Sequence, residues 1–98
     1  SYASIKGGIT NLTRQMASYY GKHNIRVNTL CPGGISGHVA GKSDKQDPLF
    51  VKNYCNKIPL KRMSNPDEIA SVALFLASDA ASYITGATIM VDGGWTAI

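Results

Sequence analysis

Apolar residues recur at steps of three and four over the first twenty positions, a spacing that predicts an amphipathic helix. The stripe consists of Ile5, Ile9, Leu12, Met16 and Tyr20. Ser1 is a suitable N-cap residue, and Gly21 is a natural place for the helix to end. Gly7 and Gly8 each lower helix stability by about 1 kcal/mol relative to alanine. They indicate either close approach by another backbone or simple tolerance of glycine.

The pattern then changes to the alternation of a strand. Apolar and polar residues alternate from Ile25 to Leu30, and this predicted strand ends at Cys31, before Pro32. Residues 33–47 have no apolar period and are rich in glycine, serine, aspartate and lysine, which indicates a loop. A helix, a short link and a strand together form the αβ half of a βαβ unit.

Residues 48–57 predict a short helix, which Pro59 ends. A longer amphipathic helix begins after Asn65, a good N-cap residue, with Pro66 at its first position. Glu68 stands three residues after the cap, where its side chain can complete a capping box. The apolar spacing of this helix predicts an end near Ser78.

The last predicted element is a short strand over residues 88–91, which Asp92 and two glycines stop. Two strands and three helices make an incomplete α/β layer, because a parallel sheet needs more strands and cover on both faces. The missing strands should precede Ser1. The chain also does not start with methionine, so we expect it to be a segment of something longer.

Composition narrows the class of protein. Ninety-eight residues are one small domain at most, and 44% hydrophobic with 16% charged residues is a globular composition. The net charge of +4 is scattered along the chain, so a nucleic-acid partner is not expected. The sequence has no signal peptide and no membrane-length apolar run, so we expect a cytoplasmic protein without a membrane partner.

Cysteine and histidine residues do not indicate a metal site. Cys31 and Cys55 form no C-x-x-C motif and are interpreted as free thiols in a reducing compartment. His23 and His38 have no ligand-like partner nearby in the sequence. We therefore expect no bound metal.

The chemistry that the sequence does suggest lies at its start. Tyr2 and Lys6 are four residues apart on the predicted helix and therefore share one face. An ammonium held near a phenol favours the phenolate and lowers the tyrosine pKa, which makes Tyr2 a possible general acid or base. Taken alone, the pair is more simply interpreted as a surface tyrosine beside a solvated lysine, because this spacing is common by chance.

The order of motifs along the chain changes that interpretation. They are Tyr2-x-x-x-Lys6, Ile25-Arg26-Val27-Asn28, Pro32-Gly33, Asn65-Pro66-Asp67-Glu68-Ile69-Ala70, Ile84-Thr85-Gly86 and Val91-Asp92-Gly93-Gly94. Across essentially all 98 residues this set resembles the C-terminal part of the short-chain dehydrogenase/reductase family. The Tyr–Lys pair is weak evidence alone, whereas the ordered set with these intervals is specific.

The resemblance implies an α/β fold, the C-terminal part of a Rossmann-type doubly wound parallel sheet that is incomplete without upstream strands. Residues 1–98 would be the C-terminal segment of a single NAD(P)-binding domain. Tyr2 matches the family's catalytic acid/base, and Lys6 matches the lysine that assists it and contacts the nicotinamide ribose. Pro32 and Gly33 match the turn along the nicotinamide, and Ile35 matches the position whose backbone meets the carboxamide.

The implied activity is hydride transfer between NAD or NADP and a small-molecule carbonyl or alcohol. The family's threonine near the cofactor is replaced here by Gly37, and Ser36 is the nearby residue that could supply a hydroxyl. The family's glycine-rich turn, serine and asparagine have no counterpart in this sequence. We therefore expect the isolated 98 residues to be inactive.

A second hypothesis is a catalytically inactive fragment that acts only as an assembly module. The resemblance implies a homo-oligomer, either a dimer or a tetramer, because the helix at the tyrosine and the segment from Pro66 to Gly94 match family interfaces. The substrate stays open between sugar-related and 3-oxoacyl-thioester carbonyls. The sequence does not choose between NAD and NADP, nor does it give the direction of the reaction.

Overall fold

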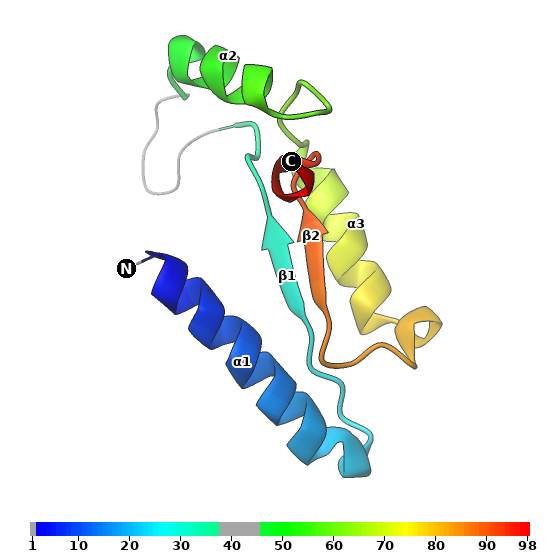
Figure 1. Ribbon diagram of the computed structural model, residues 1–98. Coiled ribbons are helices and arrows are strands. Elements are labelled where there is room, and N and C mark those ends of the chain that lie inside the picture. Colours follow the sequence, from blue (N-terminus) through cyan, green and yellow to red (C-terminus); the bar gives the residue numbers. More distant parts are fainter. Residues whose placement is uncertain (1, 38–45) are drawn as a thin grey trace. The chain divides into compact units, whose positions relative to one another are not determined.

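A computed structural model describes residues 2–37 and 46–98, with only the backbone at residues 2 and 3 (Figure 1). Its main elements are α1 (Tyr2–Tyr20), β1 (Thr29–Pro32), α2 (Pro48–Lys57), α3 (Pro66–Ala77) and β2 (Thr88–Val91). Single 3-10 turns follow α1, α3 and β2 at Gly21–His23, Asp79–Ala81 and Trp95–Ala97. The bounds predicted for α2 and β2 are confirmed, and α3 ends one residue before Ser78. The proposed Ser1 cap and most of the predicted loop lie outside the described residues.

The two strands pair in parallel. The Thr29 N–H donates to the Ala87 carbonyl at 2.9 Å, and the Gly33 N–H donates to the Val91 carbonyl, also at 2.9 Å. The two bonds join residues with the same separation along the chain, as expected when two strands run parallel. β1 and β2 are accordingly neighbours in one sheet, and their arrows point the same way in Figure 1.

The chain divides into two compact units. The first comprises residues 1–31 and 72–89, and within it helices cover both faces of β1. The hydroxyls of Thr29 and Thr13 hydrogen-bond to each other, which places α1 on one face. The next residue, Leu30, lines a crevice with Ala73 and Leu76 of α3. Because successive strand residues point to opposite faces, α1 and this part of α3 lie on opposite sides of the strand.

The start of β1 corrects the predicted strand. The structure begins the strand at Thr29, whereas the alternation predicted Ile25. Upstream, one backbone bond remains, from the Gly86 N–H to the Val27 carbonyl at 2.7 Å. The Asn28 side chain makes two others, donating to the Ile84 carbonyl at 2.9 Å and accepting from the Ala87 N–H at 3.0 Å. The Arg26 guanidinium also donates to the Ile84 carbonyl. The polar residues of this alternating segment therefore bind the backbone of residues 84–87 through their side chains.

The side of α1 that packs on the strands is not its most apolar side. Thr13 and Ala17 are 6% and 7% exposed, whereas Ile5 and Leu12 of the apolar stripe are 63% and 55% exposed. Small residues allow close approach here, and a Cβ on Gly86 would lie 3.4 Å from the Ala17 Cβ. The stripe predicted the helix correctly, but its large side chains remain on the surface of the described structure.

The second unit comprises residues 32–71 and 90–98. Its most buried large side chain is Ile58, which is 1% exposed. The Asp47 carboxylate caps α2 by accepting from the Leu49 N–H at 2.9 Å. The predicted cap of α3 is confirmed, since the Asn65 side chain accepts from the Asp67 N–H at 3.1 Å and the Asn65 N–H donates to Glu68 at 2.9 Å.

Candidate functional site

The predicted catalytic pair lies at the beginning of α1. Tyr2 is the first residue of the helix, and its side chain lies outside the described part. Lys6 follows one turn later on the same face by helix register and is exposed. The contact between Thr13 and Thr29 ties this helix to β1 within the first unit.

The predicted cofactor turn begins where β1 ends, in the second unit. Pro32 is exposed, whereas the two glycines after it are partly buried and tightly surrounded. A Cβ on Gly33 would lie 2.8 Å from the Asp92 Cα, and one on Gly34 would lie 2.6 Å from the Tyr54 ring. Neither site has room for a side chain, so packing inside this unit accounts for both glycines.

Ile35 carries a backbone donor suited to a carboxamide oxygen. It pairs with Ser64 in an isolated parallel bridge, in which the Ser64 N–H donates to the Gly34 carbonyl and the Ser36 N–H to the Ser64 carbonyl, both at 2.9 Å. The Ile35 carbonyl accepts from the Gln46 amide at 3.3 Å. No hydrogen bond of the Ile35 N–H occurs among the described residues. The Ile35 N–H is thus a backbone donor without a partner among these residues.

Backbone conformation explains why position 37 is glycine here, where the family often has threonine. Its φ is +125°, in the region that glycine adopts readily and a β-branched residue does not. A threonine at this position would be strained. Ser36, whose hydroxyl is next to this position, is exposed.

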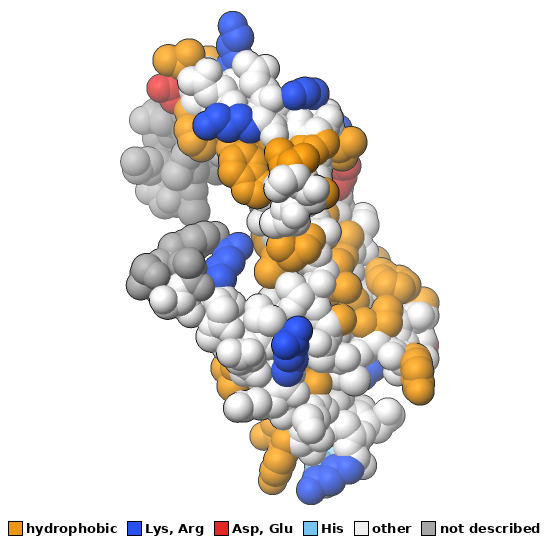
Figure 2. Space-filling view, viewed as in Figure 1, with side chains coloured by type: hydrophobic (Ala, Val, Ile, Leu, Met, Phe, Trp, Pro, Cys, Tyr) orange, Lys and Arg blue, Asp and Glu red, His pale blue; other side chains and the backbone are white. Residues whose placement is uncertain are grey.

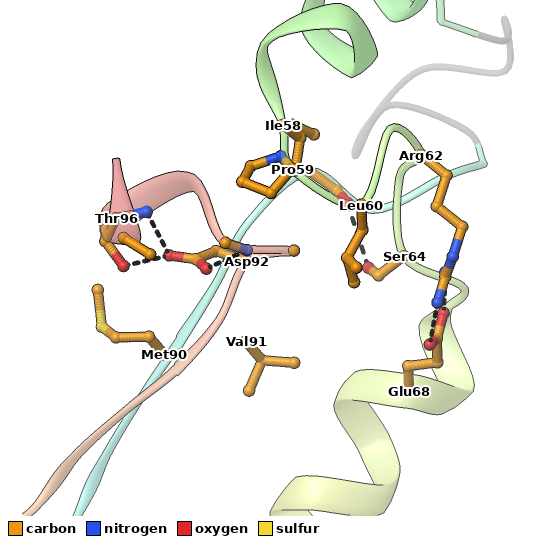
Figure 3. Close-up of a pocket in the computed structure, with 14 residues that line it drawn as sticks. Ile58, Pro59, Leu60, Arg62, Ser64, Glu68, Met90, Val91, Asp92 and Thr96 are labelled. Carbon is orange, nitrogen blue, oxygen red and sulfur yellow. Dashed lines mark hydrogen bonds and ion pairs between the residues drawn. The ribbon is translucent and has the colours of Figure 1, made fainter.

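The second unit contains a cavity of about 550 Å³ (Figure 3). Its apolar wall includes Ile58, Leu60 and Met90, and Figure 3 shows Asp92 turned toward Thr96 beside it. None of the five predicted site residues lines this cavity. Gly34 of the turn after β1 and its partner Ser64 do line it, so the cavity borders the predicted cofactor turn.

The charged groups of the cavity are held by partners within the unit. Arg62 binds Glu68 through two hydrogen bonds of 2.7 and 2.9 Å, and these bonds, with that from the Asn65 N–H, lower the Glu68 pKa to about 2. The same pairing raises the Arg62 pKa. Asp92 accepts from the Thr96 hydroxyl at 2.7 Å, which is the main cause of its lowered pKa. These groups stabilise turns and caps.

Metal-ligand clusters and membrane-length helices are both absent from residues 2–37 and 46–98. No group of three or more His, Cys, Asp or Glu side chains in these ranges could hold a metal ion. Within the same ranges, no helix has both the length and the hydropathy that crossing a membrane requires.

Comparison with known proteins places the chain in a family. The profile of a family described as Enoyl-(Acyl carrier protein) reductase matches residues 1–96. A short-chain dehydrogenase from Leptospira borgpetersenii serovar Hardjo-bovis, solved with bound NAD⁺, superposes with a TM-score of 0.83 at 39% identity, over 97% of this chain and 35% of that one. The chain belongs to the short-chain dehydrogenase/reductase family.

This short-chain dehydrogenase/reductase chain is similar both to a named dehydrogenase and to a relative named as inactive. It is 41% identical over 102 residues to 2-(S)-hydroxypropyl-CoM dehydrogenase 3 of Xanthobacter autotrophicus, covering all of this chain and 40% of the relative. It is also 40% identical over 101 residues to the inactive 2-(S)-hydroxypropyl-CoM dehydrogenase 2 of that organism, covering all of this chain and 44% of the relative. The chain thus spans less than half of each relative, and overall identity does not separate the active relative from the inactive one.

The family assignment confirms the predicted fold class. The solved neighbours are Rossmann-type proteins, and the described part of this chain contains two parallel strands of such a sheet with helices on both faces. Within the first unit the structure places Tyr2 and Lys6 on one helix. Within the second it brings Pro32, Gly33 and Ile35 together in one turn.

Sequence reasoning missed Tyr54, which contacts this turn directly. Its hydroxyl accepts a hydrogen bond from the Gly34 N–H at 2.8 Å. The sequence placed Tyr54 among the apolar residues of a short helix. The available signal was the Gly33–Gly34 doublet after a strand, since two adjacent glycines often mark close approach by another group.

Proposed function

We propose that the intact protein is an NAD(P)-dependent oxidoreductase that interconverts a small alcohol and its carbonyl, with Tyr2 as proton donor and acceptor. Membership of the short-chain dehydrogenase/reductase family carries this proposal. The Tyr2–Lys6 pair at the start of α1 and the Pro32–Ile35 turn after β1 support it. All 98 residues would then belong to one nucleotide-binding domain.

Each proposed residue has a definite task. In the direction of carbonyl reduction, the Tyr2 hydroxyl gives its proton to the substrate oxygen, and in alcohol oxidation it takes that proton back. The positive charge of Lys6 favours the phenolate and can also bind a ribose hydroxyl. Pro32 and Gly33 would lie along a nicotinamide ring, and the Ile35 N–H would donate to its carboxamide. A bound nicotinamide dinucleotide supplies or accepts the hydride.

The decisive variant is Tyr2→Phe in the intact protein, assayed with NADH and NADPH against a panel of secondary alcohols and their ketones. We expect kcat to fall about 10²–10⁴-fold, because the proton donor is lost, while NAD(P)H binding changes little. Tyr83→Phe is the matched control, since Tyr83 is fully exposed. Equal turnover by Tyr2→Phe and wild type would remove Tyr2 from the mechanism.

The assembly module remains a second candidate because α1 exposes large apolar side chains, including Ile5 and Leu12. One similar relative is also named inactive. A wild-type protein that binds neither NADH nor NADPH but self-associates would favour this candidate. Saturable dinucleotide binding with turnover that depends on Tyr2 would exclude it.

A further inference from the structure

Tyr54 connects α2 to the turn that follows β1. Besides accepting from the Gly34 N–H, its ring stacks on Trp95 with 5.2 Å between centroids and 7° between planes. The ring of Phe50, one helical turn earlier, also stacks with that of Tyr54, with 6.0 Å between centroids. Tyr54 is partly buried, and all these residues belong to the second unit.

The ring and the glycines are complementary in shape. A Cβ on Gly34 would stand 2.6 Å from the Tyr54 Cε1 and 2.9 Å from its Cζ, distances that real side chains do not adopt. A Cβ on Gly33 would stand 3.3 Å from the Tyr54 hydroxyl oxygen. The ring therefore lies directly against the turn's backbone.

The tryptophan that stacks on the ring belongs to a segment with hydrogen bonds and close contacts of its own. Trp95 follows Asp92, whose carbonyl accepts from the Trp95 N–H at 3.2 Å and whose carboxylate accepts from the Gly94 N–H at 3.0 Å. Gly94 packs so closely on Pro59 that a Cβ would lie 2.8 Å from the proline Cγ. Tyr54 thus contacts both the turn and the indole of a segment whose backbone is held by hydrogen bonds.

Tyr54 and Ser64 together fix both peptide groups that flank Gly34. Tyr54 binds the Gly34 N–H, and the Ser64 N–H and hydroxyl donate to the Gly34 carbonyl at 2.9 and 3.2 Å. A trans peptide group is planar, so the Ile35 N–H points away from the Gly34 carbonyl and from Ser64. Ser64 sets the direction of this donor through the Gly34 carbonyl, and Tyr54 holds the preceding peptide group, from which the Gly34 carbonyl continues.

We propose that Tyr54 is a positioning residue, whose hydroxyl holds the Gly33–Gly34 peptide while Ser64 holds the next one, so that the Ile35 N–H faces the nicotinamide carboxamide. This inference rests on the proposed function, because it uses the nicotinamide as the ligand of the turn. Tyr54 itself touches neither cofactor nor substrate in this scheme. It acts through the backbone of the turn.

Tyr54→Phe removes the hydroxyl and keeps the ring. In the intact protein we expect the dissociation constant for NADH, or NADPH if that is the cofactor bound, to rise about three- to tenfold, the effect of one hydrogen bond. ADP-ribose has no nicotinamide, so its dissociation constant should stay within about twofold. The near-UV circular dichroism signal of tryptophan should be unchanged because the stack of residue 54 on Trp95 remains. Tyr83→Phe should alter none of these.

Equal weakening of NADH and ADP-ribose would overturn the proposal, because it would indicate general loosening of the fold. Unchanged NADH binding would overturn it as well. If the wild type binds no dinucleotide, the proposed function fails, and hydrogen exchange at the Gly34 amide then tests Tyr54 separately. Faster exchange in Tyr54→Phe than in Tyr83→Phe would support orientation of the turn by Tyr54, and equal exchange would refute it.

Discussion

Gly93 combines two separate reasons for being glycine. Its φ is +66°, in the left-handed region, and a Cβ there would lie 2.7 Å from Cγ2 of the buried Ile58. Gly37 also has a positive φ, but no described atom lies within 4 Å of the position where its Cβ would be. Alanine substitution at Gly37 would therefore add backbone strain alone, whereas substitution at Gly93 would add strain and steric overlap.

We predict that Gly93→Ala lowers the free energy of unfolding by about 2–4 kcal/mol, from left-handed strain plus overpacking against Ile58. Gly37→Ala should lose only the strain, about 1–2 kcal/mol. Urea unfolding of both variants measures the difference. Equal losses would mean that Ile58 moves aside without penalty.

At the scale of single residues, the sequence predicts contacts between residues that are close along the chain. It misses contacts between residues that are far apart along the chain. Tyr2 and Lys6 are recognisable because four residues make one helical turn. Tyr54 reaches Gly34 from 20 positions away, and no periodicity records that contact. The apolar stripe of α1 predicts a helix but not the side that Thr13 and Ala17 bury, since partner strands decide that.

Among the elements, α3 has the most completely defined beginning. The Asn65 N–H donates to the Glu68 carboxylate, and the Asn65 side chain accepts from the Asp67 N–H. Arg62 adds two hydrogen bonds to the same Glu68 carboxylate. A carboxylate also lies well at the positive end of a helix. Glu68 therefore joins the segment before α3 to the helix itself.

We predict that this junction weakens in acid. The Glu68 pKa of about 2 lies below the ordinary value near 4.3, so its contribution to stability is complete above about pH 4.3 and is lost as pH falls toward 2. Glu68→Gln should lower the melting temperature at pH 6, and the difference from wild type should disappear near pH 2. Asp67→Asn is the control from the same turn. A difference that stays constant over this pH range would contradict the assignment.

Element boundaries could be predicted where the determining residues are neighbours in sequence. Asp47, Asn65 and Pro66 mark helix starts through their own side chains or rings, so α2 and α3 begin where expected. The beginning of β1 could not be predicted in this way. Asn28 binds the backbone around residues 84–87 with its side chain, and a sequence pattern does not distinguish this from a ladder hydrogen bond.

For the molecule as a whole, surface apolarity is the main unexplained property. Large hydrophobic side chains are exposed on α1 and on α3, where Leu74 and Phe75 are examples, and Figure 2 shows orange side chains at the surface. An exposed apolar helix face is typical of an interaction surface. It supports the proposed homo-oligomer without identifying which helix forms the contact.

A charge on α1 tests its part in self-association. We predict that Leu12→Asp shifts the intact protein to a smaller species in sedimentation velocity, because the aspartate would be buried unpaired in a subunit contact. Asn11→Asp adds the same charge at the adjacent exposed position and should leave the mass unchanged. If both variants keep the wild-type mass, α1 lies outside the contact.

The parallel register also determines the order in which the chain can fold. Val27 and Thr85, which hydrogen-bond beside the paired strands, are 58 positions apart. Closing so long a loop must precede any ladder bond, whereas a helical turn forms from neighbours within about a microsecond. We therefore expect α1 and α3 to gain helical structure in the earliest kinetic phase, and the two strands to join only in the rate-limiting step.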